Sequence, residues 1–422
     1  MSRFNAYLER QHPPGLIDVL PVNDRGSSLF VTIPCYDEPG LLTALESLSK
    51  CDAPSSGVTV IVVINSSEKS PQEVLDQNQR TIGEILNWWK NSSNNLYQLR
   101  LLHAPALPSK WAGVGWARKI AMDEAIRLLA CSEKEEGILI SFDADSTVSA
   151  NYLTEIESAF RLHPSYNFVN LTFCHPVDDP DLPASLKEGI ILYELYLRYL
   201  RNAIKWCGYV HSIHTVGSSF AVKASSYVKQ GGMNRRQAGE DFHFLHKIVL
   251  LGNYGKVTEA TVFPAARISH RVPFGTGAAL KKWEEGDQEL FSAYSLKIFE
   301  TLHPLFAEPG YFFDTDPSLW DRKFLEYDRY LVDFLMKAGT RERLIELRDN
   351  CADKKNFVKR FFHEVSAFRI IQYLNSREST EGGKGDLIVE ASRLLEILGK
   401  EGKGKNAREL LGIYRDLDKE NA

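Results

Sequence analysis

Short, largely apolar runs alternate with helix-like segments through the first half of the chain, and this alternation constrains the fold more than any other feature. The runs cover residues 29–33, 58–64, 96–102, 137–142 and 168–173. Apolar runs without polar alternation are typical of strands buried on both faces, as in parallel sheets covered by helices. Helical patterns fill the intervals, over residues 40–48, 72–90, 116–129 and 152–162. This order predicts an open α/β sheet with ligands bound beyond the carboxyl ends of its strands.

The pattern changes after Pro180. Apolar residues between positions 186 and 204 recur at alternating spacings of four and three, which predicts an amphipathic helix. From about Asp287 onward the sequence is helical and poor in strands, with an exposed connection expected over residues 376–386. We therefore expect two domains: an α/β domain over residues 1–280 and an all-helical accessory domain over residues 281–422.

The composition excludes several classes of protein. Hydrophobic residues make up 44% and charged residues 25% of 422, which excludes a disordered or collagen-like chain. The net charge of -5 argues against nucleic-acid binding, and the scattered cysteines lack metal-binding spacing. There is no signal-peptide pattern in residues 1–20 and no uncharged apolar window of ~18 residues. We expect a cytoplasmic protein without a transmembrane segment. A peripheral membrane contact and a homodimer through the helical C-terminal region stay open.

Two carboxylates directly follow one of the predicted strands. Asp143 and Asp145 stand two residues apart, and alternate residues of an extended chain point the same way. Carboxylate oxygens are the ligands that Mg²⁺ and Mn²⁺ prefer, and these ions bind phosphate oxygens at the same time. The structural alternative is that both acids cap the next helix. A second D-x-D, at Asp314 and Asp316, follows aromatic residues, so we expect a turn and helix N-cap there.

Six segments occur in the same order as motifs of family 2 glycosyltransferases and resemble them. They are residues 32–39 (P-x-Y-N-E), 110–119 (a glycine-rich turn ending in A-R-N), 143–145 (D-x-D), 217–223 (G-x-x-x-A-V-R), 231–233 (G-G-F) and 239–245 (E-D-x-D-L). The resemblance implies a GT-A type, Rossmann-like, mostly parallel sheet with flanking helices in a catalytic domain over residues 1–280. It also implies a hexosyltransferase that moves a sugar from a nucleoside-diphosphate donor, with UDP as the favoured carrier, to an acceptor hydroxyl.

The resemblance assigns the donor to residues near the ends of the predicted strands. They are Pro34, Tyr36, Glu38, Asn65, Lys110, Gly113, Arg118, Asp143, Ala144 and Arg271. Tyr36 and Glu38 would face the nucleobase and ribose. Lys110 and Arg118 would bind the diphosphate, and Arg271 would clamp a phosphate.

The same resemblance implies a bound metal ion. Asp145 would bind Mn²⁺ or Mg²⁺, and Asp143 would bind either this ion or the ribose. The cation would neutralise charge that develops on the leaving nucleoside diphosphate. His270 would complete the metal shell, as a histidine does in retaining relatives. For this reason the stereochemical outcome stays open.

An acidic pair would act on the acceptor. Asp241 would be the general base that deprotonates the acceptor hydroxyl in an inverting reaction, with Glu240 positioning the acceptor or the loop. Partial burial would have to raise the pKa of Asp241 for this role. Asn65 stands where the family usually has an acid, and His243 where a second acid is frequent. The identity of the nucleobase therefore stays open.

Two other interpretations compete with the transferase. Residues 143–147, D-A-D-S-T, match the D-x-D-x-T of haloacid-dehalogenase-like phosphatases, in which the first Asp is the nucleophile. In that family the motif opens the domain, whereas here it follows three predicted strands. The third interpretation is a non-catalytic protein that keeps the fold for binding, with Asn65 as its only sign. The ordered set of six segments favours the transferase.

Overall fold

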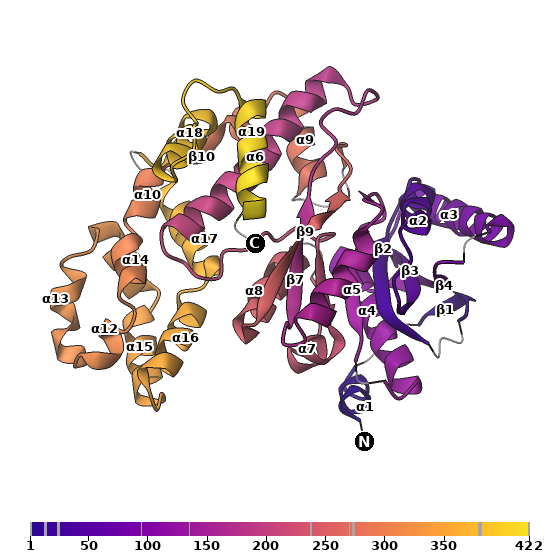
Figure 1. The fold of residues 1–422 in the computed structure, drawn as a ribbon, viewed down its shortest axis with the longest axis horizontal. Coiled ribbons are helices and arrows are strands. Elements are labelled where there is room, and N and C mark those ends of the chain that lie inside the picture. Colours follow the sequence, from indigo (N-terminus) through magenta and orange to yellow (C-terminus); the bar gives the residue numbers. More distant parts are fainter. Residues whose placement is uncertain are drawn as a thin grey trace. The chain divides into compact units, whose positions relative to one another are not determined.

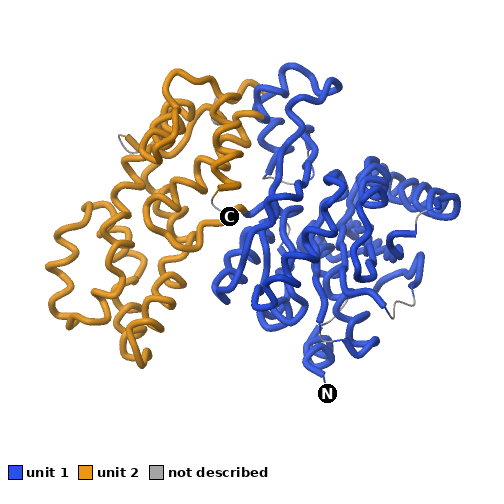
Figure 2. Tube along the Cα trace, viewed as in Figure 1, with its two compact units in different colours: residues 1–190, 215–284, 421–422 blue, residues 191–214, 285–420 orange. Residues whose placement is uncertain are grey.

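The computed structural model describes residues 2–11, 15–22, 26–93, 95–134, 136–236, 239–269, 271, 275–378 and 382–420. The chain divides into two compact units (Figure 2). Unit 1 comprises residues 1–190 and 215–284, and unit 2 comprises residues 191–214 and 285–420. The residues proposed for chemistry belong to unit 1.

A sheet of nine strands dominates the described part of unit 1 (Figure 1), in the order β1-β4-β3-β2-β5-β8-β7-β9-β6. Its strands are β1 (Ile17–Leu20), β2 (Ser27–Cys35), β3 (Gly57–Ser67), β4 (Gln98–Leu107), β5 (Ile138–Ser141), β6 (Thr147–Val148), β7 (Phe168–Phe173), β8 (Phe220–Lys223) and β9 (Tyr254–Phe263). Strands β2, β3, β4, β5, β7 and β9 point the same way, and β1, β6 and β8 run opposite to them. Most strands are therefore parallel, as predicted.

Helices cover the sheet of unit 1. They are α1 (Arg3–Leu8), α2 (Leu41–Ser49), α3 (Gln72–Asn91), α4 (Val114–Cys131), α5 (Tyr152–Leu162), α7 (Ala224–Lys229), α8 (Glu240–Ile248) and α9 (Thr276–Glu284), with a 3₁₀ turn η1 (Val249–Leu251) after α8. Helix α4 packs on β2 and β3, and it is buried on nearly all sides, whereas α3 buries only one face. Among the helices that the structure describes, none combines the length and apolar character needed to cross a membrane.

Predicted and observed elements agree where strands are buried on both faces. The five apolar runs correspond to β2, β3, β4, β5 and β7, and the helical intervals to α2 through α5. Strands β1, β6 and β9 were not predicted. Strand β9 alternates buried and partly exposed residues and carries Lys256 and Glu259, so it lacks a continuous apolar run. The α/β class with a helical C-terminal region is confirmed.

Unit 2 is almost entirely helical. Its elements are the later part of α6 (Ala184–Trp206), η2 (Gln288–Phe291), β10 (Ser292–Tyr294), α10 (Leu296–Glu300), α11 (His303–Ala307), α12 (Tyr311–Asp314), η3 (Pro317–Leu319), α13 (Trp320–Phe324), α14 (Arg329–Lys337), α15 (Thr340–Asp349), α16 (Lys354–Glu364), α17 (Ala367–Arg377), β11 (Lys384–Asp386), α18 (Leu387–Ile397) and α19 (Ala407–Glu420). The predicted amphipathic helix is α6. The carboxylate of Asp316 caps η3 by accepting a hydrogen bond from the Ser318 amide at 2.9 Å, as predicted.

One expectation about unit 2 was wrong in part. Residues 376–386 were predicted to form an exposed connection, but residues 384–386 form β11, which pairs antiparallel with β10, and residues 379–381 lie outside the described residues. The carboxylate of Glu390 explains this local order, because it accepts a hydrogen bond from the Leu296 amide, just after β10, at 2.9 Å. A Cβ on Gly385 would lie 2.7 Å from a Glu390 oxygen, so glycine permits the close approach of β11.

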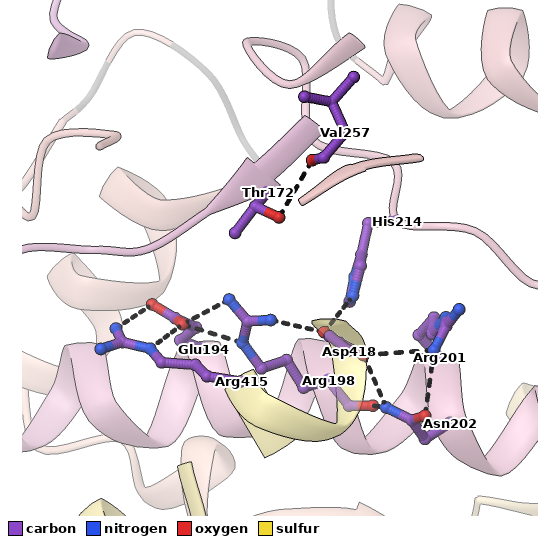
Figure 3. A network of polar contacts seen from close by, with 9 residues as sticks. All are labelled: Thr172, Glu194, Arg198, Arg201, Asn202, His214, Val257, Arg415 and Asp418. Atoms are coloured by element: carbon purple, nitrogen blue, oxygen red, sulfur yellow. Dashed lines mark hydrogen bonds and ion pairs between the residues drawn. The ribbon is translucent and has the colours of Figure 1, made fainter. Parts of the chain in front are cut away.

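A buried network of charges joins the last helix of unit 2, α19, to α6 (Figure 3). The Arg198 guanidinium contacts Asp418 at 2.5 Å and Glu194 at 2.9 Å. Arg415 contacts the same Glu194 oxygen at 2.8 Å, and His214 contacts Asp418 at 2.7 Å. Buried charges are costly unless they are paired. The network therefore specifies how α19 docks on α6.

Candidate functional site

The carboxyl ends of the parallel strands bring the predicted polar residues to one edge of the sheet. Glu38 follows β2, Asn65 lies near the end of β3, and Asp143 follows β5. Strand β8 runs antiparallel to β5 with Phe220 opposite Ser141, so the segment before β8 reaches the same edge. Ligands of open α/β sheets bind at such an edge. This edge is the candidate site.

Arg118 on α4 joins two of the predicted motifs. Its buried guanidinium donates from Nε to Glu240 at 3.1 Å and from Nη2 to Asp143 at 2.9 Å. It also donates from Nη1 to the Ser141 hydroxyl at 2.6 Å and to the Gly217 carbonyl at 3.2 Å. The D-x-D after β5 and the acidic pair at the start of α8 are therefore held by one side chain.

Asp241 lies beside this guanidinium. A Cβ on Gly217 would stand 2.9 Å from Arg118 Nη2 and 3.1 Å from Asp241 Oδ2, so glycine is needed for the chain to pass this close. Burial and the neighbouring charge of Glu240 raise the pKa of Asp241 to about 7, against the opposing effect of Arg118. Burial also raises the pKa of Glu240. A carboxylate with a pKa near neutrality is suited to act as a general base.

The start of α8 is positioned by two glycines. Gly239 has φ +68° and forms the N-terminal cap of α8, a left-handed conformation that glycine adopts without strain. A Cβ on Gly115 would stand 2.3 Å from the Arg236 carbonyl and 2.8 Å from Glu240 Cβ. Helix α4 therefore approaches the start of α8 closely only because residue 115 is glycine.

A second charged group, here called the arginine–carboxylate cluster, contains Glu38, Asp145, Arg267 and Arg271. Arg271 donates from Nη1 to Glu38 at 2.6 Å and from Nη2 to Asp145 at 3.3 Å. Arg267 Nη2 donates to the same Asp145 oxygen at 3.0 Å and also to Glu38. Glu38 is only 1% exposed, so its charge requires these partners. Both arginines thus bridge the segment after β2 and the D-x-D.

Sequence reasoning found three members of this cluster and missed Arg267. Arg267 follows β9, a strand that was not predicted, and no motif contains this arginine. Arg267 stands four positions before Arg271, but 264–269 form neither helix nor strand, so this spacing gave no signal.

Several buried polar groups at this edge have no partner within the described ranges. They are both side-chain atoms of Asn65 and the hydroxyls of Ser146, Ser218 and Ser219. Asn65 is 1% exposed, and a buried amide without hydrogen bonds is unfavourable. These groups lie in the segments that end β3, follow β5 and precede β8. Asn65 was the residue predicted to face the nucleobase.

The positions of the other predicted residues say less about ligand binding. Pro34 is buried within β2, and Ala144 is 6% exposed. Gly113 caps the start of α4, and the exposed Lys110 lies 5.6 Å from the centre of the Trp111 ring. His270 lies outside the described residues, so the structure does not place it.

The carboxylates of Asp143 and Asp145 are suited to bind a divalent cation that also coordinates a ligand. Asp143 Oδ2 and Asp145 Oδ1 have no partner among the described residues, because each arginine contact uses the other oxygen. Acidic side chains outnumber basic ones here: Glu38, Asp143, Asp145, Glu240 and Asp241 against Arg118, Arg267 and Arg271. A cation would offset this excess, and Mg²⁺ commonly uses one or two carboxylates plus phosphates. In the part of the chain that is described, no three His, Cys, Asp or Glu side chains form an all-protein metal site.

Comparison with known proteins gives distant structural similarity. No protein-family model and no curated protein matches the chain. Residues 1–349 of S. aureus TarS in complex with UDP-GlcNAc are 14% identical, with 80% of this chain and 92% of that chain covered and a TM-score of 0.41. The same fragment with UDP is 15% identical over 80% and 92% of the chains, with a TM-score of 0.38. Similarity at this level does not place the chain in a family.

Proposed function

We propose that this protein is a glycosyltransferase that moves a sugar from a nucleoside-diphosphate donor, with UDP as the favoured carrier, to an acceptor hydroxyl. The observation that carries the proposal is the Arg118 guanidinium, which holds Asp143 and Glu240 together beside Asp241. Through Arg118, the D-x-D motif, which is of a cation-binding type, lies beside Asp241, a carboxylate whose pKa is raised. Both lie at the ligand-binding edge of the sheet. A metal-assisted, inverting sugar transfer uses both.

On the acceptor side, Asp241 acts as the general base. It takes the proton of the acceptor hydroxyl while the hydroxyl oxygen bonds to the anomeric carbon of the donor sugar. The bond from that carbon to the diphosphate breaks with the electron pair leaving on the phosphate oxygen. Attack opposite the leaving group inverts the anomeric configuration. Glu240, bonded to Arg118, keeps the start of α8 in place.

On the donor side, Asn65 offers one donor and one acceptor to the nucleobase, with Glu38 and Tyr36 nearby after β2. Mn²⁺ or Mg²⁺ would be held by Asp143 and Asp145 and would offset charge on the leaving diphosphate. Arg118 was expected to bind the diphosphate, but its guanidinium already donates four hydrogen bonds to groups of the protein. We assign it the role of positioning the carboxylates.

Release of nucleoside diphosphate from a panel of UDP-sugars and GDP-sugars tests this function. We expect slow release with water as acceptor for at least one donor and loss of that release in Asp241→Asn. Binding of the donor should persist in the variant, because asparagine has nearly the same shape as the aspartate that it replaces. Hydrolysis of p-nitrophenyl phosphate without release from any donor would instead establish the phosphatase interpretation.

A further inference from the structure

Both arginines of the arginine–carboxylate cluster hold Asp145, the carboxylate proposed to bind the cation. Asp145 Oδ2 accepts from Arg267 at 3.0 Å and from Arg271 at 3.3 Å. A cation and a guanidinium compete for the same negative charge. The state described here therefore has Asp145 engaged by arginines and only partly available to a metal ion.

The two arginines differ in how many of their N–H groups already donate to described residues. Arg271 uses Nε on Ser269 at 3.0 Å, Nη1 on the Tyr36 carbonyl at 3.2 Å and Nη2 on Asp145. The contacts of Arg267 with described residues all pass through Nη2, so Nε and Nη1 keep unused N–H groups. Its side chain is 39% exposed, against 22% for Arg271. Arg267 is the member of the cluster equipped to meet an incoming anion.

We propose that Arg267 is a diphosphate-binding residue whose movement from Asp145 to the phosphates of the donor releases Asp145 for the cation. The inference rests on the proposed function, since it requires a nucleoside diphosphate at this edge. A guanidinium binds phosphate oxygens bidentately, and a diphosphate carries more charge than one carboxylate. The released carboxylate gains the cation as its partner, so no buried charge is left unpaired.

This exchange links the two ligands. In the absence of nucleotide, Arg267 competes with the cation for Asp145, and cation binding is weak. In the presence of nucleotide Arg267 leaves, and Asp145 keeps only its longer contact of 3.3 Å with Arg271. Each ligand then strengthens the binding of the other by the same factor. Loss of Arg267 therefore has two opposite effects: it weakens binding of the diphosphate and strengthens binding of the cation alone.

Two binding measurements on the full chain test this inference. Calorimetry compares UDP, GDP and the matching nucleosides, and electron paramagnetic resonance follows Mn²⁺ binding without nucleotide. In Arg267→Ala we expect affinity for the bound diphosphate to fall about 10- to 100-fold, with nucleoside affinity unchanged. Affinity for Mn²⁺ alone should rise by about 10-fold. Arg80→Ala, which removes an exposed arginine of α3, should change neither value.

Further variants separate the possible failures. Asp145→Asn combined with Arg267→Ala should remove the gain in Mn²⁺ affinity, and Arg267→Lys should keep Mn²⁺ binding weak because the positive charge is retained. Unchanged diphosphate affinity in Arg267→Ala, or unchanged Mn²⁺ affinity without nucleotide, would overturn the inference alone. Failure of the unmodified protein to bind any nucleoside diphosphate would overturn the proposed function as well.

Discussion

At the scale of single residues, Arg118 is the side chain that the candidate site needs to stay assembled. Replacing it by methionine keeps an unbranched apolar side chain at this position but leaves Asp143 and Glu240 without their guanidinium. Removal of one partner from a buried ion pair costs about 3–5 kcal/mol, and urea unfolding measures this loss. The control is Arg127→Met on the same helix, whose side chain is 44% exposed and pairs with Glu124. Equal losses in the two variants would show that the buried ion pairs of Arg118 stabilise the fold no more than an exposed pair does.

The raised pKa of Asp241 predicts how transfer depends on pH. A general base works in its deprotonated form, and burial with the charge of Glu240 raises the pKa of Asp241 to about 7. The rate should therefore be high above pH 7 and fall as the pH drops through that value. Measurement of kcat/KM between pH 5 and 9 tests this. An acidic limb near pH 4, the range of an ordinary aspartate, would contradict the assignment of Asp241 as a buried base.

At the scale of elements, the approach of α4 to α8 depends on Gly115. A methyl group at this position would collide with the Arg236 carbonyl and with Glu240, so Gly115→Ala must displace the start of α8. We expect release of nucleoside diphosphate to fall at least tenfold, since a displacement of ~1 Å at a reacting group can cost 10²-fold. Donor-release assays measure this effect.

Gly83→Ala is the matched control for this prediction. Gly83 lies within α3, and nothing stands within 4 Å of a Cβ built there. Alanine in the middle of a helix is favoured over glycine by about 0.5–1 kcal/mol, so this variant should be slightly more stable and fully active. A Gly115→Ala protein with normal activity would show that the start of α8 does not position the reacting groups.

The elements differ in how far the amino-acid sequence predicts them. Strands such as β3 are buried on both faces and give continuous apolar runs, so their positions were predicted within a few residues. Strand β9 is partly exposed on one face and was missed. The candidate site was likewise predicted only in part. The order of the motifs predicted that Asp143 and Asp241 serve one site, but the choice of Arg118 and Arg267 as ion-pair partners depends on tertiary approach between distant segments.

At the scale of the whole molecule, the chain consists of two compact units, and the network around Asp418 stabilises unit 2. Burial alone would raise the pKa of Asp418, but His214 and the arginines Arg198 and Arg201 hold it well below its usual range. A depressed pKa contributes stability above the unfolded value near 4, and this stability is lost as the pH falls below it. Asp418→Asn removes the charge that these partners share.

We expect Asp418→Asn to lower the free energy of unfolding of unit 2 by about 3 kcal/mol or more at pH 7, because it leaves buried cations short of a partner. The loss should shrink as the pH falls below about 4, where the unmodified carboxylate also loses its advantage. Scanning calorimetry at several pH values measures this change. Asp416→Asn, an exposed position on the same helix, is the control. Equal effects of the two substitutions would contradict a stabilising role for the network.

The most direct test of a nucleoside-diphosphate site is the melting temperature of the full chain with UDP, GDP and other nucleoside diphosphates in the presence of Mn²⁺. A ligand at 100 times its Kd stabilises the folded state by ~2.7 kcal/mol, which corresponds to about 5 °C or more for a unit of this size. We predict such a shift for at least one nucleoside diphosphate, retained in Asp241→Asn and reduced in Asp145→Asn. No shift with any nucleoside diphosphate would contradict the account.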